Sequence, residues 1–269
     1  MNGKLILNAL AVFLLILGIV TTTASAAVIT VDSNGGESYT SIQEAVNNAQ
    51  NGDTILVSPG VYKENIKVDK EISIISKSGS KDQINRTYVL GAVSNDDVFS
   101  VNASNVTISG FYISGGPSSG GLSEVGIYLY GADNCSLVNN TLAVNDVGIA
   151  LNNSQRNYIN NNLVGLGSSG IILVDSEYNN MINNLLCGNG IGLYLSKSSN
   201  NTIYQNVFLN FLDALDEGTN IWNSSSAGNV WSKYTGQDAN GDGIGDTPFV
   251  INETTGSTDY MPVVNKASS

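Results

Sequence analysis

The sequence predicts an all-β fold: a right-handed, single-stranded parallel β-helix with 22-residue turns, an N-terminal capping helix and an irregular C-terminal cap. Three observations predict it. Glycine recurs every 22 residues, aliphatic residues alternate with polar ones behind each glycine, and asparagine fills the segments between. Helical solenoids need apolar residues at three- and four-residue spacing, which these polar tracts do not supply. Each unit therefore predicts one turn of about three short strands. Because connections between parallel strands are right-handed, the coil is expected to be right-handed.

Four central repeats align without a gap when their glycines, Gly126, Gly148, Gly170 and Gly192, are called position 0. The remaining columns are aliphatic at +1 (Ile127, Ile149, Ile171, Leu193), +3 (Leu129, Leu151, Leu173, Leu195) and +11 (Leu137, Ile159, Met181, Ile203), and asparagine at +14 (Asn140, Asn162, Asn184, Asn206). In a parallel β-helix each column becomes a stack along the axis. We therefore expect the asparagines to exchange amide hydrogen bonds from turn to turn, or to form the sharp left-handed corners that asparagine tolerates.

Residues 1–26 are predicted to be a secretory signal peptide. Lys4 supplies a positive end, residues 9–20 form an unbroken apolar run, and Ala24-Ser25-Ala26 is a small-residue cleavage site. The run is short for a membrane span, so we expect cleavage, with an uncleaved anchor as the alternative. No second apolar stretch follows, so we expect no span in the mature chain. The expected location is therefore secreted, extracellular or at the cell surface.

The chain is acidic, with 23 acidic residues, 11 basic residues and no histidine. Removing residues 1–26 removes Lys4 and no acid, which leaves 23 acids against 10 bases and a net charge of −13. Phosphate binding needs a basic face, so nucleic acid is not an expected partner.

The β-helix is expected over residues 27–212, with a helix at 41–51 covering its N-terminal end. Ser41 and Glu44 form a capping-box pattern, the apolar residues that follow share one helical face, and Asn51-Gly52 is a stop. The first irregular strands are expected at Thr54–Val57, Asn65–Val68, Ile72–Ile75 and Tyr88–Ala92. An earlier copy of the repeat spans 101–113 and is followed by an insertion at 115–124.

Residues 213–269 are expected to form the C-terminal cap, with Trp222 and Trp231 buried over the last coil because a solenoid end needs large apolar cover. Within it, DANGDGIGD (238–246) follows the oxygen-ligand order of a calcium loop. The predicted ligands are Asp238, Asn240, Asp242, the carbonyl of Ile244, and Asp246. Phe249 stands where an EF-hand has its glutamate, so water or a distant acid such as Asp259 would complete the site. An Asp/Asn/Gly turn without an ion is the alternative.

Three segments carry a resemblance to a known family: GDTILVSPGVYKENIKVDKEISIIS (52–76), the SNNTIYQN-type repeats, and GNVWSKYTGQDANGDGIGDTPF (228–249) with DYMPVV (259–264). Together they resemble the NosD-type β-helix family, within the broader pectate-lyase-like class of carbohydrate-binding proteins and sugar hydrolases. The resemblance implies the β-helix fold over nearly the whole mature chain. The family name comes from periplasmic copper-binding proteins that assist nitrous oxide reductase maturation, and many members resemble archaeal or bacterial surface proteins.

The residues do not favour the copper role, because copper sites use imidazole or soft sulfur ligands and this chain has no histidine. Its two cysteines, Cys135 and Cys187, fall at +9 and +17, two turns apart. This spacing forms neither a disulfide nor a thiolate cluster, and we expect small core or corner residues.

We expect a non-catalytic surface module associated with carbohydrate, its partner being a polysaccharide or cell-envelope glycan. Tyr128 and Tyr194 share the outward column +2, and aromatic faces suit sugar rings, although isolated surface aromatics are common. A polysaccharide lyase or glycoside hydrolase is the alternative, but Asp133, Asp146 and Asp175 scatter around the coil instead of forming a pair.

The chain also contains nine N-x-S/T sequons, which are possible glycosylation sites in a secreted protein. Their asparagines are Asn85, Asn102, Asn105, Asn134, Asn139, Asn152, Asn200, Asn223 and Asn252. The sequence does not select among them, and it does not define an oligomeric state.

Overall fold

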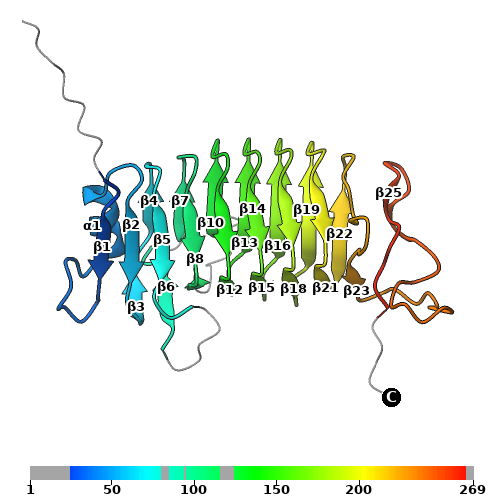
Figure 1. Cartoon of the computed structure of the whole chain (residues 1–269), viewed down its shortest axis with the longest axis horizontal. Coiled ribbons are helices and arrows are strands. Elements are labelled where there is room, and N and C mark those ends of the chain that lie inside the picture. Colours follow the sequence, from blue (N-terminus) through cyan, green and yellow to red (C-terminus); the bar gives the residue numbers. More distant parts are fainter. Residues whose placement is uncertain (1–24, 80–84, 94, 116–123, 265–269) are drawn as a thin grey trace, which may run out of the picture.

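The computed structural model describes residues 25–79, 85–93, 95–115 and 124–264, which form a parallel β-solenoid of about nine turns (Figure 1). The predicted fold class and the 22-residue repeat are confirmed. Residues 1–24 of the predicted signal peptide lie outside the described ranges.

Three parallel sheets run along the solenoid axis within the described ranges. Sheet A contains β1 (Val28–Val31), β2 (Thr54–Val57), β5 (Ser73–Ser76), β8 (Thr107–Ser109), β11 (Ser136–Val138), β14 (Tyr158–Asn160), β17 (Asn180–Ile182) and β20 (Thr202–Tyr204). Sheet B contains β3 (Gly60–Lys63), β6 (Thr87–Leu90), β9 (Tyr112–Ser114), β12 (Thr141–Ala143), β15 (Leu163–Gly165), β18 (Leu185–Cys187), β21 (Val207–Leu209) and β23 (Val230–Trp231). Sheet C contains β4 (Ile66–Val68), β7 (Phe99–Val101), β10 (Val125–Tyr130), β13 (Val147–Asn152), β16 (Ser169–Val174), β19 (Ile191–Ser196) and β22 (Leu212–Asp216).

The pairing register follows the sequence columns. Ile127 pairs with Ile149, Ile149 with Ile171, and Ile171 with Leu193, so each residue lies over its counterpart one turn away. Glycine is required at position 0 because the next turn approaches closely there. A Cβ on Gly148 would lie 2.7 Å from the carbonyl oxygen of Gly170 and 2.2 Å from a methyl group of Val164.

The asparagine column at +14 is a continuous buried hydrogen-bond ladder. The backbone N–H of Asn140 donates to Asn162 Oδ1 at 2.9 Å, and the N–H of Asn162 donates to Asn184 Oδ1 at 3.0 Å. The Nδ2 of Asn162 also donates to Asn184 Oδ1 (3.0 Å) and to the carbonyl of Leu137 (2.8 Å). These side chains therefore satisfy backbone groups at the corner between sheets A and B, where strand pairing cannot. The preceding column, at +13, provides the left-handed corner itself, with φ of 57° at Asn139 and 54° at Asn161.

Two further ladders run along the other corners, and all three end on a carboxylate. The +14 ladder continues through Asn229 to Asp259, and a ladder built from Asn157, Asn179, Asn201 and Asn220 ends on Asp216. A third, through Asn189 and Asn210, ends on Asp213. In each ladder the N–H groups of one member donate to a side-chain oxygen of the next member towards the C-terminal end. The last member therefore accepts a hydrogen bond but has no further member to which it can donate. An aspartate can do this, because its carboxylate oxygens accept hydrogen bonds.

The N-terminal lid is α1 (Ile42–Asn48), which buries Ile42, Ala45 and Val46. Ser41 Oγ accepts the N–H of Glu44, as the capping pattern predicts, while the Glu64 carboxylate accepts the N–H groups of Ile42 and Gln43. The helix ends at Asn48, so the predicted span of 41–51 is too long. Asp53 explains the difference, because its carboxylate accepts the N–H of Gln50 and favours the extended chain that follows.

Two N-terminal strands have no counterpart in the sequence-based expectation. β1 precedes the helix and pairs with β2, and β3 starts sheet B. Their segments lie outside the regular 22-residue repeats, so no column alignment marks them.

The coil also continues past the expected boundary at residues 212 and 213. β22 crosses that boundary and pairs with β19, and β23 pairs with β21. Ile191 pairs with Leu212, a separation of 21 residues, so this turn loses the 22-residue spacing while it keeps the parallel ladder. The cap beyond it contains the antiparallel pair β24 (Phe249–Asn252) and β25 (Ser257–Asp259). Trp222 and Trp231 are buried as predicted, and Trp231 stacks on Phe208 and Phe249.

Candidate functional site

Sheet C presents the predicted tyrosine column on its outer face. Side chains alternate along each strand, so Ile127 and Leu129 are buried while Tyr128 between them is half-exposed. Tyr128 pairs with Ala150, Ala150 with Ile172, and Ile172 with Tyr194. The structure therefore brings the two tyrosines onto one face, three turns apart, with small or aliphatic side chains between them.

Hydrogen bonds hold both phenol groups. Asn152 Nδ2 donates to the oxygen of Tyr128 at 3.3 Å, and the Tyr194 hydroxyl donates to Glu217 Oε1 at 3.0 Å. Tyr130, which is 58% exposed, extends the aromatic surface, with its ring centroid 6.2 Å from that of Tyr128. Tyr130 was not among the binding residues predicted from the sequence. The alternation of VGIYLY, which places Tyr130 two residues beyond Tyr128 on the same face, could have identified it.

One pair of carboxylates does stack on neighbouring turns. The N–H of Val147 donates to the carbonyl of Glu124, which places Glu124 one turn before Asp146. Within the described residues, Glu124 Oε2 and Asp146 Oδ2 are buried and have no hydrogen-bond partner. This pair was not predicted from the sequence, because Glu124 lies at the end of the insertion. Glu124 is only 1% exposed, so a sugar in solvent cannot contact its carboxylate without a rearrangement of the corner.

Asp97 lies near this pair, before β7, and is half-buried. Burial raises the pKa of Asp97 to about 6, and the neighbouring charge of Asp96 acts in the same direction. The side chain therefore changes its charge near neutral pH.

The predicted calcium loop is an exposed turn organised by its own acidic side chains. Asp238 accepts the N–H groups of Asp242 (3.0 Å) and Gly243 (2.9 Å), and Asp246 Oδ2 accepts the N–H of Ala239 (2.9 Å). Asn240 Oδ1 also accepts the N–H of Asp242, and Gly243 has a φ of 91°, which suits the tight turn.

Ile244 attaches this loop to the end of the chain, through an antiparallel bridge with Val263. Among the described residues, no group of three or more His, Cys, Asp or Glu side chains is arranged to hold a metal ion.

Asp259 cannot complete that loop, contrary to the sequence-based expectation. It is fully buried and accepts hydrogen bonds from the N–H of Asn229 (2.8 Å) and from Trp231 Nε1 (2.9 Å). Burial raises the pKa of Asp259, while the bonds from Trp231 and Asn229 act in the opposite direction. Its role is to end the +14 ladder and to hold Trp231 over the last coil.

A profile of the family described as periplasmic copper-binding protein (NosD) matches residues 46–236, more than two thirds of the chain. The chain belongs to the NosD family. The match covers the regular coil and the beginning of the cap, and it agrees with the family that the sequence resembles.

One curated relative of this NosD-family chain is a cell surface glycoprotein of Methanothermus fervidus. It is 34% identical over 112 residues, which cover 40% of this chain and 16% of the relative. The similarity therefore covers about a sixth of that protein's length.

Two solved structures that resemble the NosD-family coil are polysaccharide lyases. The alginate lyase of Paenibacillus sp. str. FPU-7 has 17% identity and a TM-score of 0.47, with 76% of each chain covered. The pectate lyase Pel9A has 13% identity and a TM-score of 0.48, with 77% of this chain and 68% of that chain covered.

The copper chemistry in the family description does not fit the donors of this chain. It has no histidine, Met181 is buried in the core, Met261 lies in the cap, and Cys135 and Cys187 are free thiols that lie in different parts of the coil. Burial raises the pKa of Cys135 to about 11, which keeps that thiol protonated and unsuited to binding a metal. The predicted absence of a disulfide is confirmed. In the described part of the chain, no helix is long and apolar enough to cross a membrane.

Proposed function

We propose that this chain is a non-catalytic β-helix module of the cell surface or extracellular space that binds carbohydrate on the outer face of sheet C. The observation that carries the proposal is the half-exposed column from Tyr128 through Ala150 and Ile172 to Tyr194. The surface location is supported by the periplasmic description of the family and by the cell surface relative.

The geometry of this column suits an extended glycan. Successive turns are about 4.8 Å apart, a rise comparable to the length of one pyranose unit, so a polysaccharide along the axis would meet equivalent positions on each turn. Tyrosine rings at both ends offer apolar faces to sugar C–H groups, and Asn152, Ser169 and Ser196 offer hydrogen-bonding groups on the same sheet. An aromatic platform with few charges therefore favours a neutral or weakly charged glycan.

Substituting both tyrosines should test this assignment. Tyr128→Ala with Tyr194→Ala should weaken polysaccharide binding roughly fivefold or more, because each lost ring removes about 0.5–1.5 kcal/mol of stacking. Retention of labelled polysaccharides by the purified protein measures the effect. Tyr204→Ala, which removes a half-buried tyrosine from the outer face of sheet A, is the control. Equal loss in the control and the double variant would contradict a site on sheet C.

A polysaccharide lyase or glycoside hydrolase is the second candidate, and the stacked carboxylates Glu124 and Asp146 are the observation in its favour. Adjacent turns place them near the separation that retaining glycosidases use. The burial of Glu124 weighs against this candidate, because a general acid must contact the substrate.

The cap loop is proposed to hold a structural calcium ion through Asp238, Asn240, Asp242, the Ile244 carbonyl and Asp246. Loop oxygens that accept an N–H keep a second lone pair for a cation, so the observed turn does not compete with the ion. Three carboxylates lie within nine residues, and a cation would offset their repulsion. Its role would be to fix the end of the chain, to which Ile244 is bridged, over the last coil.

A further inference from the structure

The outer face of sheet B is a largely apolar, half-exposed strip that runs the length of the solenoid. One outward column contains Val61, Tyr88, Tyr112, Thr141, Leu163, Leu185, Val207 and Val230, paired turn by turn. The second contains Lys63, Leu90, Ser114, Ala143, Gly165, Cys187 and Leu209. Aliphatic side chains predominate, with few hydrogen-bonding groups, which suits a protein surface better than a glycan.

The charge of this strip differs from that of the chain as a whole. The protein has a net charge of −12, yet neither outward column contains an acidic residue. Two copies of an acidic chain repel each other, and they can approach with least repulsion through a face that lacks carboxylates. Among the described residues at its N-terminal end, Lys63 and Arg86, just before β6, carry positive charge, and the Glu124 carboxylate lies behind Gly115.

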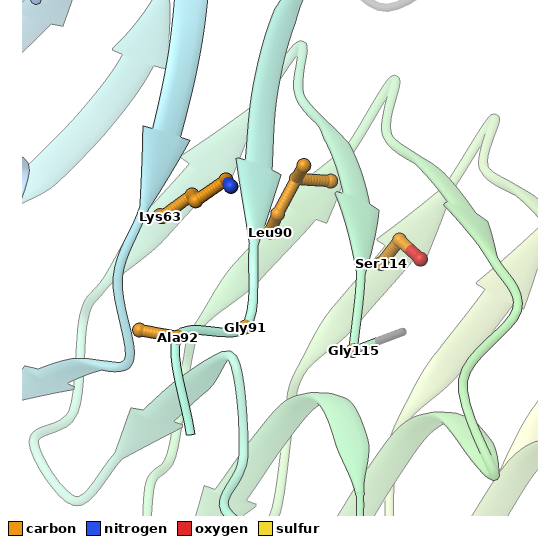
Figure 2. Close-up of a pocket in the computed structure, with 6 residues that line it drawn as sticks. All are labelled: Lys63, Leu90, Gly91, Ala92, Ser114 and Gly115. Carbon is orange, nitrogen blue, oxygen red and sulfur yellow. The ribbon is translucent and has the colours of Figure 1, made fainter. Parts of the chain in front are cut away.

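The two halves of the strip differ in shape. A hollow of about 440 Å³ lies at its N-terminal half, lined by Lys63, Leu90, Gly91, Ala92, Ser114 and Gly115 (Figure 2). At the C-terminal half, Leu209 is exposed at the end of β21, and Phe211, two residues beyond, is 85% exposed. Both features lie where the sheet B strands end and the chain turns towards sheet C.

A two-fold rotation matches these features. Sheet B has the order β3, β6, β9, β12, β15, β18, β21, β23, so its midpoint lies between β12 and β15. Consider a two-fold axis that runs parallel to the strands, at that midpoint, between two copies of the chain. Rotation about it brings the two sheet B faces together, and the solenoid axes of the two copies then run in opposite directions. It brings β6, which borders the hollow, opposite β21, which precedes Phe211. The strand ends stay on the same side, so Phe211 of each copy meets the hollow of the other.

We propose that the outer face of sheet B binds a second copy of this chain in an antiparallel, two-fold symmetric dimer, with Phe211 of each copy inserted over Gly91 and Gly115 of the other. The equal strand spacing of both copies allows their side-chain columns to interdigitate along the whole strip. The sheet C face remains free in this dimer, so the inference does not depend on glycan binding.

Sedimentation equilibrium over a concentration series tests the dimer. The wild-type chain should approach twice its monomer mass. Leu163→Glu, at the centre of the strip, should remain monomeric, and so should Phe211→Ser, which cannot disturb the core because its side chain is exposed. Tyr158→Glu is the matched control, and this variant should still dimerise. Tyr158 and Leu163 lie on strands of the same turn and are 40% and 37% exposed, but Tyr158 belongs to sheet A. A monomeric wild-type protein, or a dimer that survives both strip variants, would overturn the proposal.

Cross-linking tests the direction of the two copies. The two-fold operation places β9 opposite β18, so a thiol at Ser114→Cys would face native Cys187 of the second copy. A short bis-maleimide should join these two thiols between chains, as identified by peptide mass spectrometry. Ser109→Cys, on the outer face of sheet A, should give no intermolecular product. A link between two copies of Cys187 in the wild-type chain would indicate parallel packing and overturn the antiparallel arrangement.

Discussion

At the scale of single residues, the asparagine ladders show how this chain satisfies its corners. Asn162 accepts one backbone N–H and donates its amide to two oxygens, so one side chain serves three turns. Leucine has nearly the same size but cannot replace these bonds, and it leaves buried polar groups unpaired.

Asn162→Leu should therefore lower the free energy of unfolding by about 1–3 kcal/mol, because its neighbours in the ladder lose their partners. Urea unfolding followed by circular dichroism measures the change. Asn180→Leu is the control, since Asn180 is half-buried on the outer face of sheet A, and its effect should stay within about 0.5 kcal/mol. An unchanged unfolding midpoint for Asn162→Leu would show that the ladder does not contribute to stability.

Asp97 should make stability depend on pH in the direction opposite to an ordinary salt-bridged carboxylate. Its pKa is raised to about 6 by burial, so between roughly pH 4 and 6 the folded state holds the proton more tightly than the unfolded state. Its contribution to stability therefore falls as pH rises through 6. Asp97→Asn should make the melting temperature at pH 7 rise relative to that at pH 5. Parallel profiles of melting temperature against pH for the wild-type protein and Asp97→Asn would refute this prediction. The raised pKa of Asp259 does not interfere, because Asp259 is present in both proteins.

At the scale of elements, the central turns followed from the sequence because their strands come from an exact repeat. Each aligned column became a hydrogen-bonded stack, and the +14 asparagines became a ladder, since a parallel coil converts sequence period into spatial register. The expectation failed where the spacing changes. β1 and β3 precede the regular repeats, and β22 follows a turn of 21 residues, so pairing in these places depends on packing that no column alignment records.

The candidate site was predictable in part for the same reason. The common face of Tyr128 and Tyr194 follows from the repeat, and alternation within β10 adds Tyr130. The stack of Glu124 on Asp146 did not follow, because an insertion precedes Glu124 and hides its register. The burial of Asp259 depends on how the cap folds back over Asn229 and Trp231, which lie 30 and 28 residues away in the sequence.

The cap loop supports a prediction at the same scale. Calcium should raise the melting temperature of the wild-type chain and a chelator should lower it, because the ion would offset the charges of Asp238, Asp242 and Asp246. Asp242→Ala should abolish the difference. Glu253→Ala, which removes an exposed acid outside the loop, should preserve it. Differential scanning calorimetry in calcium and in chelator measures both, and coincident melting curves for the wild-type protein would remove the ion from this account.

At the scale of the whole molecule, the three sheets differ in chemistry although they share one coil. Sheet C carries the column from Tyr128 to Tyr194, the outer face of sheet B is largely apolar and its strands carry no outward acids, and serine, threonine and asparagine are frequent on sheet A. A solenoid permits this division because every turn contributes to each face, and a property repeated in one column extends along the entire axis. The coil can therefore present a ligand surface and a self-association surface at the same time.

The central claim is that this surface module binds glycan without cleaving it. The most direct test incubates the purified protein with acidic and neutral polysaccharides in the presence of calcium, and follows retention together with new reducing or unsaturated ends. We expect the wild-type chain to retain at least one polysaccharide and to produce no new ends. Release of such ends, lost in Asp146→Asn, would contradict the non-catalytic assignment and establish the stacked carboxylates as an active site.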